Sequence, residues 1–566
     1  MVVVGTAAPV PLADSNASVL VIPVEQTPRF DASAGLLRED ASIFVEQRGA
    51  GGAQNDIALR GGSFAQTLVL VNGFRINDAQ TAHHNLDLPI PLEAMHDVQV
   101  LHGAGSTLHG TDALSGVVDF LTAAPSQGSI LLRAGGGSFG QNEQALMAGG
   151  VRGRASARVT GERNFSTGFI PDRDYRNEDA SLESWVGSKL GTTDLLFAGS
   201  DRAFGADQFY GPYPSWERTK GWFAALRQDV GEKTVAAFGW RRHTDNFILF
   251  RENPAIYENN HIDSSWQASL RRTEHVRGAT VLFGLEENGD SIDSNNLGLH
   301  ARNRGSGYVD VDLHPGEKRW SASVGAREEI FSGGEQAFAP HFAGSLRLAK
   351  TLKARASGGY GFRIPTYTDL YYSDPTTIGN ANLRPESAWS GEAGLDWAAG
   401  SKLHVSATGF YSHEHDAIDY VRANSASKWQ AENLTGLRFA GVETNATWQP
   451  GHGQQVQVSW TALFGAQDAL HGLQSEYVFN YPVNNVHILW SAALGRGVVL
   501  TNALQVAQRY QQTAYPVWDA AVVRSHGMVR PYVRVQNAAN TGYAEITDVR
   551  MPGRAVVGGV AVSLGR

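Results

Sequence analysis

The 566-residue sequence contains no cysteine, which excludes two classes of protein. Small secreted folds held by disulfides and thiolate metal sites both depend on cysteine side chains. The chain also lacks the run of about 18 apolar residues that a transmembrane helix needs. A disulfide framework, a thiolate metal site and a helical membrane protein are therefore excluded.

Charge is the next scarce feature, with 18% charged residues against about 25% in soluble proteins. The net charge of −9 is modest and no basic cluster stands out, so nucleic acid is not an expected partner. Glycine and aromatic residues are abundant instead, with 63 Gly, 24 Phe, 17 Tyr and 13 Trp. This composition fits a sheet with one face in lipid, and a membrane-spanning sheet must close into a barrel.

Many segments alternate between apolar and polar residues. In residues 455–462, Val456, Val458 and Trp460 share one face, and the opposite face carries small or uncharged polar residues. Residues 319–327 and 403–411 follow the same pattern, as does the last segment of the chain, residues 556–564. A soluble sandwich also alternates, but polar partners such as Ser, Thr, Gly and Gln are typical of a wet barrel lumen.

Turn signals separate these segments, with short turns at 396–401 and 449–453 and longer polar stretches at 371–386 and 412–433. Short turns on one side and long loops on the other are the outer-membrane pattern. Roughly 440 residues follow residue 126, and about 20 residues per strand and connection give about 22 strands. We therefore predict a transmembrane β-barrel of about 22 antiparallel strands over residues 127–566.

Residues 12–126 have a different character and read as a small α+β domain. Thr67–Val71 is a buried-type strand, and Asn72-Gly73 after it is a strong hairpin signal. Val98–Leu101 and Ser115–Thr122 are two further short strands.

The same region resembles the plug of TonB-dependent receptors. The resemblance is carried by Ile57–Gly62, Leu68–Gly73, Asp97–Gly103 and Ser106–Val118, in the family's order and spacing. The barrel adds similar motifs at Gly361–Thr366 with Gly379–Glu386, at Asn433 with Gly441–Glu443, and at Asn537, Tyr543 and Met551–Arg554. The resemblance implies an N-terminal plug inside the barrel lumen.

The resemblance also implies partners. Val2, Val3, Val4, Gly5, Thr6 and Ala7 are similar to a TonB box, which pairs by strand addition with the periplasmic C-terminal domain of TonB and its inner-membrane energising complex. Residues 1–11 would be this segment and its linker, although a frayed N-terminus would look the same. We read the chain as a mature or trimmed form, since no signal peptide follows Met1.

Plug arginines of the family pair with barrel glutamates, and Arg60 and Glu386 match such positions. We expect both residues at the plug–barrel contact. The family usually has arginine where His102 stands, which would weaken one contact at neutral pH and make plug retention sensitive to pH. A second departure is the non-aromatic end of the last strand, Ser563–Arg566.

The candidate ligand site lies on the extracellular side. His83, His84 and Asn85 occupy a position similar to a plug-apex loop, and Tyr210, Tyr213 and Trp216 form an aromatic-rich loop. Alternatively, the histidines belong to an ordinary solvated loop and the aromatic residues to an interfacial girdle. His413–Asp416 could suit a divalent ion, but we favour an ordinary charged loop there.

The sequence contains no catalytic motif and indicates no cofactor and no resident metal. The resemblance implies a monomeric TonB-dependent transporter in the outer membrane of a Gram-negative-type bacterium, embedded in its lipid. Its ligand would be a small-molecule metal complex, cobalamin or a ferric siderophore. The alternatives are a passive channel or a surface-binding barrel without energy coupling, and an outer-membrane enzyme.

Overall fold

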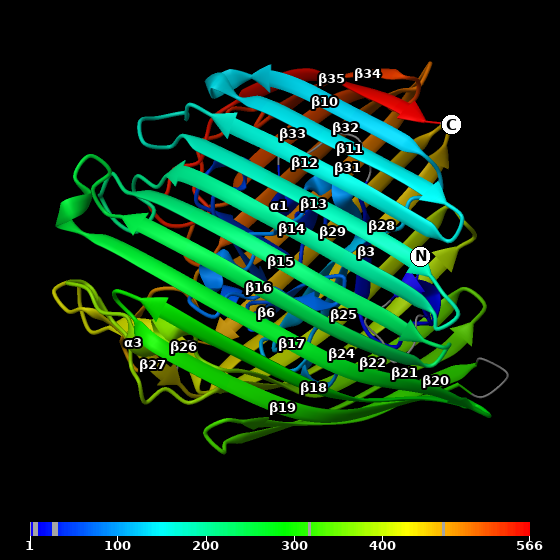
Figure 1. Ribbon diagram of the computed structural model, residues 1–566, viewed down its shortest axis with the longest axis horizontal. Coiled ribbons are helices and arrows are strands. Elements are labelled where there is room, and N and C mark those ends of the chain that lie inside the picture. The colour runs from blue at the N-terminus through cyan, green and yellow to red at the C-terminus, as the bar shows by residue number, and fades with distance from the viewer. Residues whose placement is uncertain (1, 4–9, 25–31, 315–318, 467–469, 566) are drawn as a thin grey trace.

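The computed structural model describes residues 2–3, 10–24, 32–314, 319–466 and 470–565. Its main feature is a closed barrel of antiparallel strands that surrounds an N-terminal domain (Figure 1). The described barrel consists of 22 strands, which confirms the predicted fold. They are β10 (Ser129–Gly137), β11 (Asn142–Arg152), β12 (Ala155–Ser166), β13 (Tyr175–Gly187), β14 (Thr192–Gly205), β15 (Trp216–Val230), β16 (Thr234–Ile248), β17 (Glu258–Val276), β18 (Ala279–Ser294), β19 (Gly298–Leu313), β20 (Trp320–Phe331), β21 (Gln336–Ala349), β22 (Leu352–Arg363), β24 (Glu386–Ala399), β25 (Leu403–His415), β28 (Leu437–Gly451), β29 (Gln454–Ala466), β31 (Pro482–Gly495), β32 (Val498–Arg509), β33 (Tyr515–Arg524), β34 (Val529–Gln536) and β35 (Ala555–Gly565).

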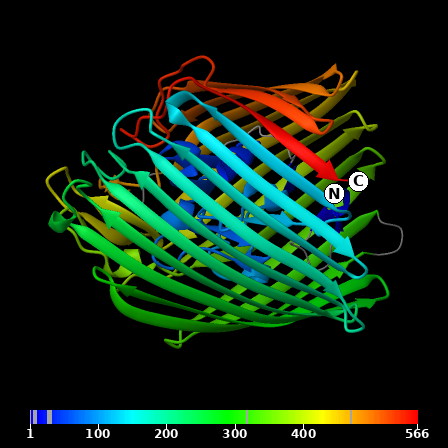
Figure 2. The same ribbon diagram turned by 45° about the horizontal axis from the view of Figure 1, so that its top comes forward.

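The two faces of the barrel wall follow the alternation in the sequence. On β29, Val458 and Trp460 point outward and are 36% and 37% exposed, while Ser459 and Thr461 point into the lumen and are buried. Val556, Val560 and Leu564 share the outer face of β35. Outward apolar side chains of this kind recur around the wall and form its lipid-facing band. Figure 2 shows the tilted strands that make this wall.

The two rims of the barrel differ in their connections. At the end where both chain termini lie, β24 and β25 are joined by residues 400–402, and β28 and β29 by residues 452–453 (Figure 1). The opposite rim carries long loops with elements of their own: α3 (Tyr367–Tyr371), β23 (Thr377–Ile378), β26 (Ala417–Arg422), β27 (Trp429–Leu434) and β30 (Gln474–Ser475). These four strands form one small sheet in the order β23-β27-β26-β30.

The N-terminal domain is built on a five-stranded sheet in the order β3-β8-β9-β6-β7. The predicted hairpin is present, since Asn72 and Gly73 both adopt positive φ and join β6 to β7 as a two-residue turn. The main elements are β3 (Val19–Pro23), α1 (Ser33–Leu37), β4 (Ile43–Gln47), β5 (Asn55–Leu59), β6 (Thr67–Val71), β7 (Phe74–Arg75), β8 (Met95–His102), α2 (Ser106–His109) and β9 (Gly116–Thr122). In the described residues, no helix has the length and apolar character needed to cross a membrane.

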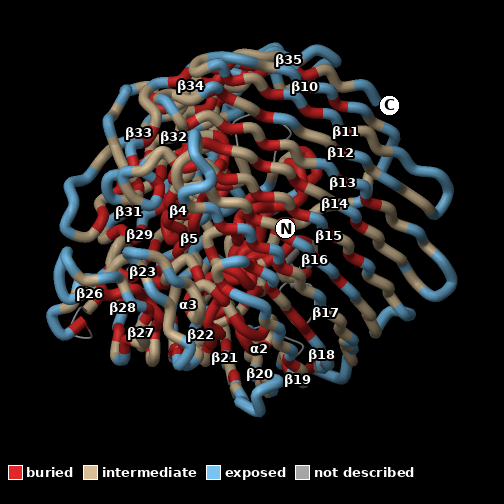
Figure 3. The backbone as a smooth tube through the Cα atoms, turned by 60° about the vertical axis from the view of Figure 1, so that its left-hand side comes forward, coloured by how far each residue is buried: buried red, intermediate tan, exposed pale blue. Residues whose placement is uncertain are grey.

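This domain fills the lumen (Figure 3). Its apolar core, which includes Val69 and Phe120, continues into Leu196 and Phe223 of the barrel wall. The barrel closes where β35 pairs with β10, the strand that directly follows the plug. The plug's last strand ends at Thr122 and β10 begins at Ser129, while the proposed boundaries at residues 11 and 126 stay predictions.

Candidate functional site

A cluster of aromatic and charged side chains lies where the plug meets the long-loop rim of the barrel. We call it the apex cluster and define it as Arg48, Asp56, Phe64, His83, Tyr210 and Tyr477. The His83 ring stacks on Phe64 with centroids 4.4 Å apart, and Tyr477 meets Phe64 edge-on at 5.3 Å. Tyr210 lies 6.3 Å from His83 and is 42% exposed. The cluster is therefore an aromatic floor that reaches the surface.

Short helical turns place the plug residues of this floor. Phe64 begins the 3-10 turn η3 (Phe64–Gln66), and His83 belongs to η4 (Ala82–His84). A capping box formed by Ser63 and Gln66 fixes the start of η3. The apex loops thus have a defined backbone on which the rings can stack.

Charge at the apex cluster is balanced internally. The Nδ1 atom of His83 lies 2.9 Å from Asp56 Oδ2, and Arg48 Nη2 lies 3.7 Å from the same oxygen. The Arg48 guanidinium also covers the Tyr210 ring at 5.0 Å. Burial lowers the pKa of His83 and outweighs the opposing effect of Asp56, so the imidazole is neutral at pH 7.

The structure separates the six residues predicted to bind ligand. His83 and Tyr210 come together in the apex cluster. His84 is 3% exposed and turns toward the barrel wall, and the Asn85 side chain accepts a hydrogen bond from the backbone N–H of Asp78. Adjacent residues of the η4 turn point in different directions, so His84 and Asn85 lie apart from the apex cluster.

The two remaining aromatics also lie elsewhere. Tyr213 packs against Phe250 of the next loop with centroids 5.6 Å apart. Trp216 begins β15, where its neighbour Glu217 is buried and points into the lumen. Strand alternation then directs Trp216 outward, which agrees with the girdle alternative and corrects its assignment to the ligand site.

Four members of the apex cluster were missed in the sequence: Arg48, Asp56, Phe64 and Tyr477. Phe64 lies two residues after the Gly61-Gly62 motif of the plug, and Tyr477 lies in an aromatic-rich loop. That loop signal could have indicated Tyr477, but only the fold brings these segments together.

The plug is fastened to the barrel through Arg60, a buried side chain. Its Nη1 donates to Glu392 Oε2 at 2.7 Å, and its Nη2 donates to Glu443 Oε1 at 2.6 Å. Ser18 of the plug donates to both glutamates as well. Arg60 thus links β24 and β28 to the plug by charge-assisted hydrogen bonds.

Glu386 also meets the plug, but through another residue. It accepts from Gln66 Nε2 at 3.1 Å and forms its ion pair with Arg363, 2.9 Å away on the neighbouring strand. Arg60 and Glu386 thus both lie where the plug meets the barrel, each with its own partners.

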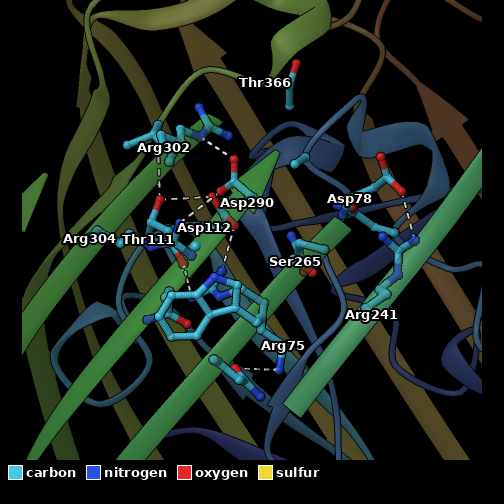
Figure 4. A pocket seen from close by; sticks show the side chains of 18 of the residues that line it. Arg75, Asp78, Thr111, Asp112, Arg241, Ser265, Asp290, Arg302, Arg304 and Thr366 are labelled. Carbon is cyan, nitrogen blue, oxygen red and sulfur yellow. Dashed lines mark hydrogen bonds and ion pairs between the residues drawn. The ribbon is translucent and has the colours of Figure 1, made fainter. Parts of the chain in front are cut away.

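A second polar contact surrounds a small cavity between the plug and β16–β19 (Figure 4). Arg75 pairs with Asp112 at 2.7 Å within the plug, and Arg241 of β16 pairs with Asp78 at 2.8 Å. The cavity holds about 50 Å³. That is room for a few water molecules at most, too little for a large ligand.

A larger cavity of about 590 Å³ lies against the other wall of the barrel. Its lining includes His102 and Gly103 of the plug and extends to His275 and His314, which lie at the short-turn rim. A volume of this size is typical of small-molecule sites. The plug therefore fills the lumen unevenly and leaves a chamber beside β19–β25.

His102 pairs with a carboxylate of the plug itself. Its Nε2 lies 2.7 Å from Asp40 Oδ2, and both side chains are buried. Burial alone would lower the pKa of His102, but Asp40 and Glu443 outweigh it and raise that pKa. The protonated imidazole is thus favoured more than in a free histidine, and Arg60 is the nearby positive charge that opposes it.

This pair gives a prediction about pH. A raised folded-state pKa means that the stabilisation is complete below the ordinary value of about 6.5 and is lost as pH rises through the folded value. Between pH 6 and pH 9, the protection factors of β3 and β8 amides, which correct for the intrinsic pH dependence of exchange, should therefore fall several-fold. His102→Gln should remove this pH-dependent loss of protection. His96→Gln, at an exposed plug histidine, should keep it. Equal pH dependence in His102→Gln and the parent would contradict the assignment.

Two further sequence hypotheses have different outcomes. In the described residues, the His and carboxylate groups that converge do not include His413–Asp416; Glu414 accepts from Gln66 and Asp416 pairs with Arg384. Of the TonB-box-like segment, Val2 and Val3 form β1, antiparallel to β2 (Val10–Pro11). Val4, Gly5, Thr6 and Ala7 lie outside the described residues.

Comparison with known proteins agrees with this architecture. Residues 11–117 match the TonB-dependent Receptor Plug Domain, and residues 134–558 match the family described as TonB dependent receptor-like, beta-barrel. The Vitamin B12 transporter BtuB of Photobacterium profundum is 26% identical over 465 residues, 78% of this chain and 74% of its own length. BtuB of Vibrio vulnificus is 23% identical over 612 residues, 96% of this chain and 92% of its own.

Solved structures show the same fold. The siderophore receptor PirA from Acinetobacter baumannii superposes with a TM-score of 0.80 at 14% identity, covering 96% of this chain and 98% of its own. The Serratia marcescens hemophore receptor HasR also reaches 0.80 at 14% identity, covering 97% and 99%.

The chain belongs to the TonB-dependent receptor family. It is a protein of the Gram-negative outer membrane, and its family consists of transporters and receptors rather than enzymes. The long-loop rim is accordingly the extracellular side and the short-turn rim the periplasmic side.

Proposed function

We propose that this receptor actively imports a large, scarce nutrient, with cobalamin as the favoured ligand and a ferric siderophore as the second candidate. The observation that carries the proposal is a closed barrel whose lumen is filled by a fastened plug with an aromatic floor at its extracellular end. A filled lumen does not suit a passive channel, because diffusion needs an open path. Import then requires energy that moves the plug.

The balance of charge at the apex cluster favours a neutral ligand. Its arginine, Arg48, is already engaged by Asp56 and by the Tyr210 ring. An anionic ferric catecholate would need cationic groups free to neutralise it. Flat rings such as Phe64 and Tyr477 suit the apolar surface of a corrin. The B12 transporters among the sequence relatives support the same choice.

The test compares cyanocobalamin with a ferric catecholate, using the purified receptor and equilibrium binding. We expect cyanocobalamin to bind at least ten-fold more tightly. Phe64→Ala and Tyr477→Ala should each weaken it about ten-fold, as buried aromatic anchors do. Tyr411→Ala is the control, since this tyrosine is 48% exposed on the lipid-facing side. Failure of both ligands to bind, or equal effects of all three variants, would refute the proposal.

Energy coupling is a separate prediction that concerns residues 2–7. We propose that this segment adds as a strand to the periplasmic domain of TonB, through backbone hydrogen bonds. Val4→Pro removes a backbone donor and should abolish uptake in cells while leaving surface binding unchanged. Val4→Ile keeps the donor and should transport at the parental rate. Parental uptake by Val4→Pro, or by cells without TonB, would show that the segment does not couple.

A further inference from the structure

A second cluster of ionisable side chains lies below the apex, between the plug loop after η4 and strands β15–β17. The plug contributes His84 and Asp87, and β16 contributes His243. All three side chains are at least nine-tenths buried. Their ligand atoms lie within 4.8 Å of one another, so two imidazoles and one carboxylate converge on a common point.

The spacing of these atoms is too long for hydrogen bonds but suits a bridging cation. His84 Nδ1 lies 3.6 Å and His243 Nε2 lies 3.4 Å from the same oxygen, Asp87 Oδ2. Ligands at about 2.0–2.1 Å from a tetrahedral zinc ion stand about 3.3–3.4 Å apart. The observed distances are close to those edges, whereas a 3.6 Å contact is not a hydrogen bond.

His243 provides an independent observation. It is 1% exposed, and neither of its ring nitrogens makes a hydrogen bond of normal geometry. Its Nδ1 has carboxylates beside it, but a buried Nε2 without a hydrogen bond is costly unless another partner uses it. Its Nε2 is the atom that faces Asp87.

The outer nitrogen of each histidine lies against carboxylates. His243 Nδ1 is 2.9 Å from Asp78 Oδ2, and His84 Nε2 is 3.5 Å from both Glu217 Oε1 and Asp245 Oδ2. Metal-binding histidines usually have a carboxylate or carbonyl at the nitrogen that does not face the metal, because it fixes the tautomer. On Asp87, Thr219 donates to Oδ2 at 2.8 Å and orients the third ligand.

With both histidines neutral, as metal ligands must be, the local charge would call for a cation. Five carboxylates surround the two histidines, while only two arginines, Arg202 and Arg241, pair with them in the described residues. The carboxylates are Asp78, Asp87, Glu217, Asp245 and Asp263. A divalent ion would offset this excess where water cannot.

From this geometry we propose that His84, Asp87 and His243 bind a divalent first-row transition metal ion of the zinc class, which ties the plug to β16. Imidazole and carboxylate ligands suit such an ion. The proposal is independent of which nutrient the receptor imports. It adds a resident metal that the sequence did not indicate, because the ligands come from segments about 160 residues apart.

The experiment uses the whole purified receptor, freed of metal with a chelator and then dialysed against Zn²⁺ or Co²⁺. We expect one ion per chain and, with Co²⁺, the intense visible absorption of a tetrahedral site. His84→Gln, Asp87→Asn and His243→Gln should each weaken binding at least ten-fold. Asp263→Asn, one shell further out, should weaken it about ten-fold. His96→Gln, at an exposed plug histidine, should bind as the parent does.

Hydrogen exchange tests whether the metal ion links the plug to β16. Zn²⁺ should protect amides 82–87 in the parent and not in His84→Gln. If a variant fails to fold, Co²⁺ binding by the parent receptor still tests the proposal. A parent that binds no Co²⁺, or shows only octahedral absorption, would overturn the proposal. So would folded His84→Gln and His243→Gln proteins with parental affinity, which would place any bound ion elsewhere.

Discussion

Replacing Arg60 by methionine should weaken the attachment of the plug to the barrel wall by about 3–5 kcal/mol. This is the cost of leaving buried charges without their partner. Glu392 and Glu443 are both buried, and each would lose its contact with the guanidinium. The barrel should still assemble, because its strands pair with one another.

The absence of native cysteine makes this measurable, since one introduced thiol is then the only reactive one. With Ser42→Cys as the reporter in the buried plug, we expect labelling by a soluble maleimide to be about a hundred-fold faster in Arg60→Met. Adding Glu392→Gln and Glu443→Gln should restore most of the protection. Arg163→Met removes an exposed pair with Glu178 and should change little. Unchanged labelling in Arg60→Met would show that the plug is held by other contacts.

A valine at Gly361 should displace the segment of the plug around residue 114. A Cβ atom on Gly361 would lie 2.7 Å from Leu114 Cα and 3.1 Å from Leu114 O. Backbone atoms cannot rotate away as a side chain does, so the overlap forces the plug off β22. Asp112 N donates to Phe362 O at 2.9 Å, and we expect this hydrogen bond to break too.

The overlap should cost at least about 1–3 kcal/mol, the usual range for overpacking, and more where backbone must move. The measurements are hydrogen exchange of residues 106–114 and sensitivity of cells to a water-soluble antibiotic too large for porins. Gly409→Val is the matched control, because a Cβ at Gly409 meets nothing within 4 Å. Equal results for both variants would mean that added bulk in a strand, and not the close approach to the plug, is responsible.

The barrel was predictable because its two faces repeat along every strand. Val458 is apolar, as a lipid-facing residue should be, and its neighbour Ser459 is polar, as a lumen-facing residue should be. The hairpin at Asn72-Gly73 was equally clear, since a two-residue turn with two positive φ angles strongly prefers these residues. Local chemistry thus determines strands and turns.

The site was predictable only in part, because it depends on how the plug is rotated inside the barrel. Arg60 meets β24 and β28, yet nothing in its own segment specifies which glutamates face it. His83 and His84 are neighbours in sequence but point to different environments, one to aromatic rings and one to carboxylates. Such choices arise from packing between segments hundreds of residues apart.

The seam between β10 and β35 has a consequence for how the molecule is made. These are the first and last barrel strands, so the cylinder cannot seal until the whole chain has been threaded into place. Only residues 123–128 separate β9 from β10, which keeps the plug beside the wall from the outset. The barrel strands must then assemble around a plug that is already connected to the first of them, β10. Mutations at the seam should therefore leave an unsealed barrel with the plug still tethered to β10.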